Sequence, residues 1–310
     1  MANSHIPDTS SVGGLSLAGF RQLSALFEAM RPKQWSKNLL LFAGLIFSEN
    51  FLIASKTLTS VAGFAIFCLL SSSVYILNDI IDIEKDKNHP LKRNRPLPSG
   101  RLTLVSAYSG VVLFSTVAIA SALKLNLAFG LLAILYFTSI TLYSLFLKNY
   151  VIIDVIVIAL GFVLRAVAGT VVIQVELSNW LLICTFFMAL FLALCKRRHE
   201  LVLLGDGRSK HRKILNEYST LLLDQMLAVV TAATIITYAL YTMAPDTIAN
   251  FGTNKLVLTI PFVLFGIFRY FYLVYEKDKG GSPENILLSD RPILLNILLY
   301  GIAVFLILYT

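Results

Sequence analysis

The sequence predicts an all-α integral membrane protein with nine transmembrane helices, and three observations support this fold class. Of its 310 residues, 57% are hydrophobic and only 14% are charged, whereas about a quarter of the residues of a soluble domain are charged. The mean hydropathy is +0.76, and the apolar residues gather in stretches close to the roughly 20 residues of one bilayer crossing. Ten-residue segments of alternating polarity are absent, which excludes a transmembrane β-barrel.

The first thirty residues differ from the rest of the chain. Residues 1–19 are rich in serine and glycine and lack a basic segment followed by an apolar core, so we expect no cleavable signal peptide and disorder to about Phe20. We therefore divide the chain into a flexible, amphipathic segment, residues 1–30, and a transmembrane domain, residues 31–310. No loop is long enough for a separate soluble domain.

The nine apolar stretches follow one another with short connections. The first and the sixth are short for a full crossing, so we expect them to extend or tilt. In chain order the predicted spans are residues 39–53, 58–77, 104–123, 127–147, 151–173, 180–194, 226–243, 256–275 and 293–309.

The basic residues determine the predicted orientation. If the chain crosses the membrane nine times, nearly all the lysines and arginines that flank the spans fall on one side of the membrane. The exceptions, on the other side, are Lys56, Lys124 and Lys255. Because lysine and arginine are retained in cytoplasmic loops, the N-terminus is predicted inside and the C-terminus outside. This bias also accounts for the net charge of +8, so a nucleic-acid partner is not needed to explain it.

Closely spaced carboxylates end the second span, in the pattern Asn78-Asp79-x-x-Asp82-x-x-x-Asp86. If the helix continues, Asn78, Asp82 and Asp86 recur every four residues and Asp79 lies on the same face. Three like charges on one stripe repel each other unless a cation lies among them. Hard oxygen ligands favour Mg²⁺, which usually keeps positions open for water and substrate phosphate. The alternative is a solvated acidic helix end.

Three connections on the cytoplasmic side can surround these acids. The first, residues 88–100, is rich in proline and carries Lys92 and Arg95. The second is a tight turn from Tyr143 to Lys148. The third, residues 196–218, is the longest and most basic loop, and it begins with Lys196 and Glu200 spaced i, i+4 at the end of the sixth span.

A few polar residues lie deeper or carry no motif. Arg165, inside the fifth span, is costly in hydrocarbon and should face a cavity or a partner. Arg269, near the end of the eighth span, can extend to the interface. The three cysteines and four histidines show no disulfide or metal-ligand spacing, so we expect packing or surface roles for them.

The acid motif, at the end of the second of nine spans with a basic loop behind it, resembles the first aspartate-rich motif of the UbiA-type membrane prenyltransferase superfamily. That resemblance covers nearly all of the chain after about Met30. It implies nine helices around a central cavity and acidic motifs that bind Mg²⁺ and a diphosphate. Most members carry a second acidic motif after the sixth span, where this chain has Lys196-Arg197-Arg198-His199-Glu200.

This departure, together with residues 31–38 and the Tyr143–Lys148 turn, is similar to one branch of the superfamily. The branch implies Mg²⁺-dependent transfer of 5-phosphoribosyl from phosphoribosyl diphosphate to a polyprenyl phosphate in the bacterial inner membrane, for a cell-envelope glycan. Asp79, Asp82 and Asp86 would then hold the metal, with Asn78 as a ligand or orienter. Tyr143 and Glu200 would position the donor or the metal, and Arg165 would meet the lipid phosphate. The residues implied to bind phosphate groups are Lys33, Lys92, Arg95, Lys148, Lys196 and Arg197.

Two other functions remain open at this point. One is transfer of a prenyl group to an aromatic acceptor, which explains the first acidic motif but not the missing second one. The other is a transporter or lipid-binding protein, which predicts inverted repeats and helices broken at mid-membrane. The oligomeric state is also open, with a homo-oligomer as one option.

Overall fold

The structure, a computed structural model, describes all residues except 1–9, 177, 205–212, 278–279, 282 and 310. Every regular element in those described residues is a helix. In chain order the elements are α1 (Ser10–Ala29), η1 (Pro32–Leu41), α2 (Phe42–Phe47), α3 (Ala54–Ile81), α4 (Ile83–Lys87), η2 (Lys92–Asn94), α5 (Leu104–Leu125), α6 (Leu127–Leu145), η3 (Leu147–Asn149), α7 (Ile153–Val172), α8 (Asn179–Leu204), η5 (Lys213–Asn216), α10 (Thr220–Met243), α11 (Pro245–Phe251), η6 (Lys255–Thr259), α12 (Ile260–Tyr275), α13 (Pro283–Ser289) and α14 (Arg291–Tyr309).

Eight helices of the described chain are long and apolar enough to cross a membrane: α3, α5, α6, α7, α8, α10, α12 together with η6, and α14. The predicted helical membrane fold is therefore confirmed, but the count of nine is not. The stretch predicted at residues 39–53 is a 3₁₀ helix, η1, followed by the short helix α2. The helix ends at Phe47 because the chain turns there, with Glu49 in the left-handed region at φ 57° and Asn50 donating hydrogen bonds to Ser48.

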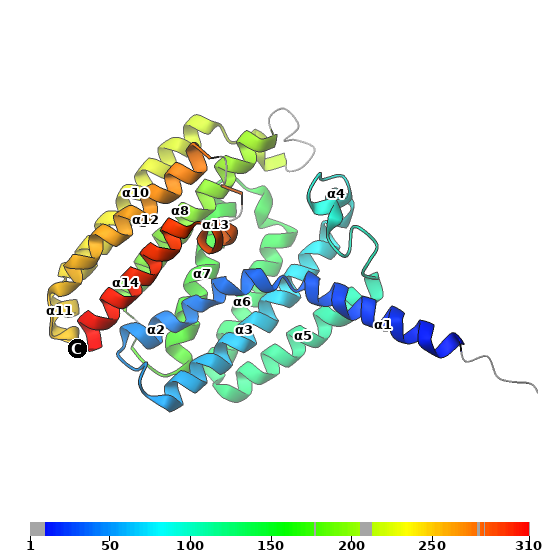
Figure 1. The fold of residues 1–310 in the computed structure, drawn as a ribbon, viewed down its shortest axis with the longest axis horizontal. Coiled ribbons are helices and arrows are strands. Elements are labelled where there is room, and N and C mark those ends of the chain that lie inside the picture. Colours follow the sequence, from blue (N-terminus) through cyan, green and yellow to red (C-terminus); the bar gives the residue numbers. More distant parts are fainter. Residues whose placement is uncertain (1–9, 177, 205–212, 278–279, 282, 310) are drawn as a thin grey trace, which may run out of the picture.

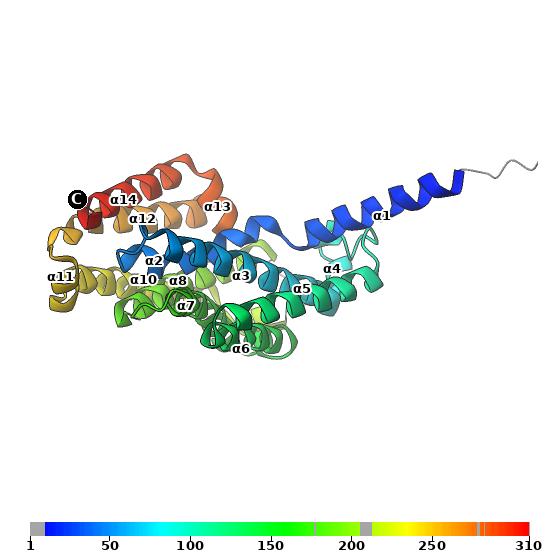
Figure 2. The same cartoon turned by 90° about the horizontal axis from the view of Figure 1, so that it is seen from below.

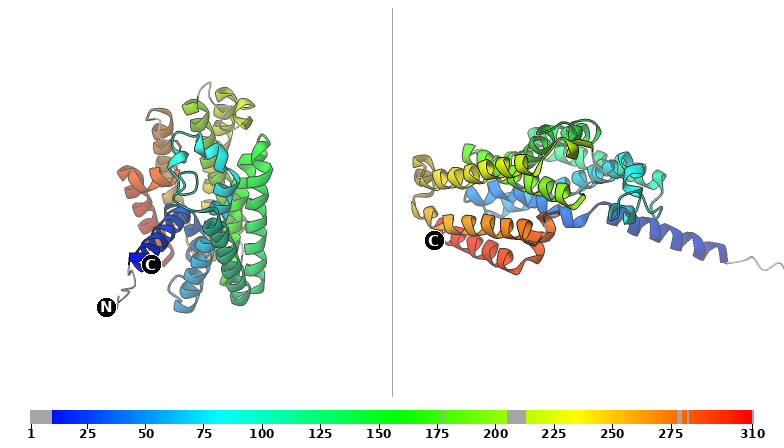
Figure 3. Two further views of the ribbon diagram at one scale, coloured as in Figure 1. Left: turned by 90° about the vertical axis from the view of Figure 1, so that its right-hand side faces the viewer. Right: turned by 90° about the horizontal axis from the view of Figure 1, so that it is seen from above.

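The long helices lie side by side, with α4 and α1 at one end of the bundle and α11 and the C-terminus at the other (Figure 1). Helices that follow each other in the chain pack together, and η1 and α2 pack against α3 and α7. Figure 2 shows α1 extending away from the bundle beside α4. The two views of Figure 3 show the same arrangement from the side and from above. The end that carries α4 therefore collects the segments between several spans.

Three predicted boundaries need correction. Helix α1 begins at Ser10, whereas disorder was expected to about Phe20, because apolar residues from Leu15 onward recur with helical spacing. Helix α8 continues to Leu204, ten residues beyond the predicted end, so Lys196 and Glu200 lie within a helix and not in a loop. Tyr143 likewise belongs to α6, which ends at Leu145.

Side chains cap several of the spans where the sequence offers a short polar residue. The Thr103 hydroxyl accepts a hydrogen bond from the backbone N–H of Ser106, and Asn126 and Ser219 do the same for Phe129 and Leu222. Such caps satisfy backbone donors that the first turn of a helix leaves without partners. They explain why α5, α6 and α10 begin where they do.

Gly169 allows the first segment to pack closely on α7. A Cβ atom at this position would lie only 2.1 Å from the carbonyl oxygen of Leu41, a contact that no side chain tolerates. Gly44 shows the same restriction from the other side, where a Cβ would lie 2.6 Å from Thr170. The pair holds η1 and α2 against α7 and so positions the residues of η1 at the end that carries α4.

We expect Gly169→Ala to destabilise the protein by about 1–3 kcal/mol, the usual cost of inserting a methyl group into a packed interior. Gly301→Ala is the matched control, because no atom lies within 4 Å of a Cβ built at that helical glycine. Thermal unfolding of both variants in detergent measures the difference. Equal unfolding temperatures would contradict the packing described for α7.

Candidate active site

The acid motif lies where α3 passes into α4. Helix α3 ends at Ile81, and Asp82 adopts φ −98° and ψ 9° before α4 begins. The expected continuous helix is thus interrupted at Asp82, although the helical pattern of hydrogen bonds persists: the N–H of Asp82 donates to the Asn78 carbonyl at 3.0 Å and that of Asp86 to Asp82 at 2.8 Å. Asp79 and Asp86 therefore remain on one face.

Arg95 joins Asp79 and Asp86. Its Nη1 atom donates to Oδ1 of Asp79 at 3.0 Å and to Oδ2 of Asp86 at 2.7 Å. Both carboxylates are nearly inaccessible, at 2% and 3% exposed, and Arg31 forms a second ion pair with Asp79. The loop after α4 thus folds back onto the acids, because two buried carboxylates need compensating charge.

Asp82 has a different partner. Lys148, in η3, donates to its two carboxylate oxygens at 2.7 and 2.8 Å. The side chains of both residues are partly accessible, at 18% for Asp82 and 13% for Lys148. The turn between α6 and α7 therefore meets the acid motif, as the sequence predicted.

Lys92 links the first and third connections. Its Nζ lies 3.8 Å from Oδ1 of Asp86. Burial lowers the pKa of Lys92; the negative charges of Asp86 and Glu200 oppose this shift, while the positive charges of Arg95 and Lys196 reinforce it. The end of α8 is therefore near enough to act on the acid motif, and Lys92, Lys196 and Glu200 belong to one electrostatic group.

Arg197 is buried within a network of its own. It is 2% exposed and pairs with Asp154 at 2.8 Å and with Glu200. Asp154 is inaccessible and also accepts a hydrogen bond from the Tyr218 hydroxyl at 2.8 Å. Burial raises the pKa of Tyr218 to about 12, so the phenol keeps its proton at neutral pH. These contacts join α7 and α8 to the segment just before α10.

Arg165 lies deeper, between η1, α6 and α7, and is 5% exposed. Its guanidinium donates to Asn38 at 2.8 Å, to the Tyr136 hydroxyl at 2.6 Å and to the Gly161 carbonyl at 2.9 Å. Asn38 in turn donates to Ser71 on α3. The Arg165 guanidinium is therefore surrounded by protein hydrogen-bond acceptors. The sequence predicted either a cavity or a partner around Arg165, and the structure shows partners.

Three further predicted site residues are Asn78, Tyr143 and Lys33. Asn78 and Tyr143 are half-buried, and Lys33 is exposed on η1. Among the described residues, no three histidine, cysteine or acidic side chains come together as a ready-made metal cluster. However, one cationic nitrogen of Arg95 already occupies the space between Asp79 and Asp86. The two carboxylates therefore share one positive charge at this position.

Residues that the sequence did not single out complete the site. Arg31 precedes Pro32 and adopts the left-handed backbone conformation, with φ 54° and ψ 63°. That backbone directs Arg31 to Asp79. Asp154 and Tyr218 neutralise and orient Arg197. Arg31 belongs to the stretch at residues 31–38 that supported the resemblance, and Asp154 left a signal as an acidic residue at the start of a span.

An apolar cavity of about 350 Å³ lies among α2, α8, α10, α11 and α14, lined in part by Phe47, Trp180, Met188 and Tyr238. It reaches Asn250 on α11, a helix that lies at the end of the bundle opposite to α4 (Figure 1). The Tyr238 hydroxyl bonds to Thr259 at 2.6 Å and to Tyr300 at 3.1 Å, which leaves a mainly apolar lining. Such a space suits hydrocarbon.

Comparison with known proteins agrees with this arrangement. A model described as "UbiA prenyltransferase family" matches residues 39–289. The chain is 34% identical to a decaprenyl-phosphate phosphoribosyltransferase of Mycolicibacterium smegmatis, over 87% of both chains. Identity to the enzyme of that name from Corynebacterium glutamicum is 31%, over 86% of this chain and 81% of the relative. A UbiA homolog from Archaeoglobus fulgidus, solved with GPP and Mg²⁺, has the same fold, with a TM-score of 0.71, 19% identity and coverage of 92% and 100%.

Proposed function

Because the chain belongs to the UbiA prenyltransferase family, we propose that it transfers 5-phosphoribosyl from phosphoribosyl diphosphate to a polyprenyl phosphate. The observation that carries this proposal is the cationic surroundings of the acid motif, where Arg31, Lys92, Arg95 and Lys148 all pair with its carboxylates. A donor with a diphosphate and a further phosphate, together with an anionic acceptor, requires more cations than one diphosphate does.

The residues suit substitution at the anomeric carbon of ribose. The bond between C1 and the diphosphate oxygen breaks, and an oxygen of the lipid phosphate forms the new bond to C1. Since the acceptor is already an anion, no residue has to remove a proton. Arg95, Lys92 and Lys148 exchange their carboxylate partners for phosphate oxygens, which aligns the donor and stabilises the departing charge.

Asp79, Asp82 and Asp86 would hold Mg²⁺, with Asn78 as a ligand or orienter. The metal, when bound, supplies positive charge for the leaving diphosphate. The convergence of Asp79 and Asp86 on a cationic nitrogen supports this ligand set, as does the Mg²⁺ in the Archaeoglobus homolog. Tyr143 and Glu200 would position the donor or metal, and the apolar cavity offers space for isoprenoid carbons.

Two predicted phosphate contacts take a modified form. Arg197 already has two carboxylate partners, so we assign it the positioning of Glu200. Arg165 already has three protein acceptors, so we assign it the positioning of η1 through Asn38. The residues left to meet phosphate directly are Lys33, Lys92, Arg95, Lys148 and Lys196.

The activity is tested with purified protein, radiolabelled phosphoribosyl diphosphate, a polyprenyl phosphate and Mg²⁺. We expect label in a lipid-soluble product that requires both substrates. A parallel reaction with a prenyl diphosphate and an aromatic acid tests the alternative activity of the family. Product only in the parallel reaction would overturn the proposal.

Lys196→Ala is expected to raise the KM for phosphoribosyl diphosphate more than that for the polyprenyl phosphate. The loss of one charge-assisted contact typically costs about 1.5–3 kcal/mol, or roughly 10- to 150-fold. Kinetics with each substrate varied in turn measure the effect. Lys210, which the sequence explains as a topology signal, supplies the control Lys210→Ala, with unchanged constants expected. A selective effect of Lys196→Ala on the lipid substrate would move this residue to the acceptor side.

We also propose that the acid motif faces the cytoplasm in a bacterial inner membrane, with the N-terminus inside. A single cysteine at Asn88, introduced after Cys68, Cys184 and Cys195 are replaced by alanine, should react with an impermeant maleimide only in inside-out vesicles. A cysteine at Asn250, on α11, should react only in right-side-out vesicles. The reverse pattern would refute this orientation.

Helix α1 carries exposed apolar side chains on one stripe and buried alanines elsewhere. Phe20, Leu23 and Phe27 are exposed along one stripe of α1, while Ala25 and Ala29 are buried. Glu28 forms a bidentate ion pair with Arg101 at 2.5 and 2.8 Å. We propose that α1 lies at the membrane surface and steadies the loop that carries Arg95.

A further inference from the structure

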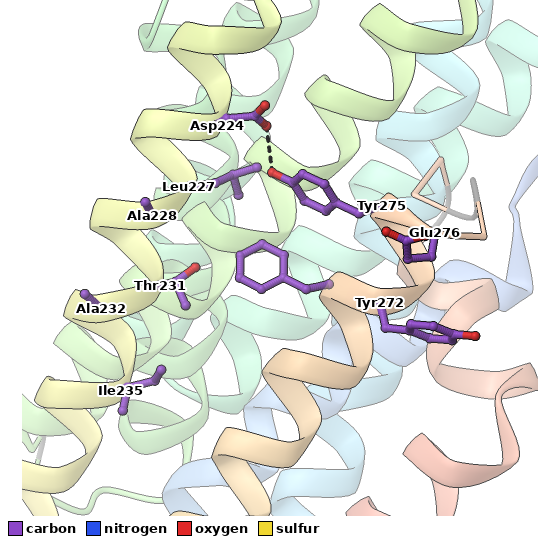
Figure 4. Close-up of a pocket in the computed structure, with 10 residues that line it drawn as sticks. Asp224, Leu227, Ala228, Thr231, Ala232, Ile235, Tyr272, Tyr275 and Glu276 are labelled. Carbon is purple, nitrogen blue, oxygen red and sulfur yellow. Dashed lines mark hydrogen bonds between the residues drawn. The ribbon is translucent and has the colours of Figure 1, made fainter.

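A groove lies between α10 and α12, two helices that are far from the acid motif in the sequence. Its volume is about 580 Å³. Figure 4 shows Asp224, Thr231 and Ile235 along the α10 wall and Tyr272 and Tyr275 on the α12 wall. Both helices are long enough to cross the membrane, so we expect the groove to lie within the bilayer and its open side to face lipid.

One end of the groove is charged, and it lies at the end of α8 that also carries Lys196 and Glu200. Asp224 accepts hydrogen bonds from Nε of Arg198 and from the Tyr275 hydroxyl, both at 2.6 Å, and the Arg198 guanidinium lies 3.7 Å from the Tyr275 ring centroid. Glu276 lines the groove and is followed by Lys277. Arg198 and Asp224 thus form an ion pair at this end of the groove, and the Lys277 ammonium lies 5.6 Å from the ring centroid of Tyr272, another lining residue.

The other part of the groove is apolar except for one hydroxyl. Ala228 and Ala232 expose only small side chains, and Ile235 and Phe271 continue the lining. Thr231 is 7% exposed, and its Oγ1 atom has no hydrogen-bond partner. By contrast, the Thr242 hydroxyl on the same helix donates to the Ala239 carbonyl at 2.8 Å. A buried hydroxyl without a partner is costly, so Thr231 indicates an acceptor supplied from outside the chain.

We propose that this groove binds one glycerophospholipid with a zwitterionic headgroup. Arg198 and Lys277 face its phosphate, and Asp224 and Glu276 face its ammonium group. Thr231 lies seven residues from Asp224, about 10.5 Å along the helix, where it donates to an ester carbonyl. The acyl chain then covers Ala228, Ala232 and Ile235. A polyprenyl phosphate fits less well, because it has no ester carbonyl for Thr231 and no ammonium group to balance the two carboxylates.

The bound lipid also bears on the candidate active site. Arg198 directly follows Arg197, whose partner Glu200 belongs to the electrostatic group around Lys92. A phospholipid that contacts Arg198 therefore holds the end of α8 from outside while Asp154 holds it from inside. The site proposed here is separate from the acid motif and does not depend on which reaction the protein catalyses.

Native mass spectrometry tests the site on full-length protein released from nanodiscs that contain equal amounts of phosphatidylethanolamine and phosphatidylglycerol. We expect the wild type to retain one phosphatidylethanolamine. Ala232→Phe fills the groove and should abolish retention, whereas Val229→Phe, at a neighbouring position 70% exposed and outside the groove, should not. Thr231→Val should lower retention about 2- to 12-fold, the effect of one hydrogen bond, and Thr242→Val should leave it unchanged.

The same spectra contain the results that would overturn the proposal. Equal lipid retention in Ala232→Phe and Val229→Phe would show that the lipid binds elsewhere. A preference for phosphatidylglycerol would contradict the zwitterionic headgroup. A lipid-free wild-type oligomer that Ala232→Phe converts to monomer would show that a second copy of the chain covers the groove. Circular dichroism and the melting temperature of each variant identify any that fail to fold; in that case Thr231→Val, which keeps the side-chain volume, decides the question.

Discussion

Asp82→Asn is expected to lower turnover by at least about 10²-fold, the typical effect of removing one charge-stabilising group from a catalytic site. The substitution keeps the shape of the side chain but removes the charge that pairs with Lys148 and that we propose for Mg²⁺. Because the Asp82 side chain is partly accessible, the protein should still fold and insert. Turnover is measured across a Mg²⁺ titration, in which the variant should require more metal than the wild type.

Glu84→Gln provides the control for this prediction. Glu84 lies two residues after Asp82, in α4. Its side chain is 78% exposed and forms an ion pair only with Lys87 in the described structure, so the loss of its charge should leave turnover near the wild-type value. The variant Lys148→Met tests whether Asp82 acts by binding the metal or only by positioning Lys148. If Asp82 acts only by positioning Lys148, then Asp82→Asn, Lys148→Met and the double variant should all lower turnover by the same factor. Near-normal activity of Asp82→Asn at saturating Mg²⁺ would refute the metal assignment.

Arg197→Gln is expected to destabilise the protein by about 3–5 kcal/mol, because removing one partner of a buried ion pair leaves an uncompensated charge. Asp154 is inaccessible to solvent, and Arg197 supplies its ion pair at 2.8 Å. Thermal unfolding in detergent should show a large decrease in melting temperature and a low yield of folded protein. The kcat should fall as well, since Glu200 loses the residue that orients it.

The double variant Asp154→Asn with Arg197→Gln should recover much of the lost stability, because both charges are then removed together. Lys196→Gln, at the adjacent half-buried position, is the matched control and should unfold near the wild-type temperature. An Arg197→Gln protein of unchanged stability but raised KM for phosphoribosyl diphosphate would instead make Arg197 a direct phosphate ligand. That outcome would restore the role implied by the resemblance.

The membrane class and most of the spans could be read from the sequence, because burying hydrocarbon in lipid depends on the apolar length of each segment. The acid motif could be found for a similar reason. Its residues are close in the chain, and local hydrogen bonds from Asn78 to Asp86 keep Asp79 and Asp86 on one face. Lys148 and Lys92 were also predicted near the acids, because short connections at the same end of a helical bundle must lie close to one another.

Other features depended on contacts between residues far apart in the chain, which periodicity and composition do not encode. The left-handed backbone at Arg31 and its pairing with Asp79, 48 residues away, follow from how η1 packs on α3. The stretch predicted as the first span is instead a 3₁₀ helix joined to a short α-helix, and it packs closely on α7 because Gly169 admits the backbone at Leu41 to close contact. Arg197 had the residue type of a phosphate ligand, but Asp154, supplied by a neighbouring helix, neutralises it. The sequence by itself determined the helical membrane class, most of the spans and where the charges gather along the chain. Only the tertiary structure decided which charges neutralise each other, because that depends on distances across the bundle.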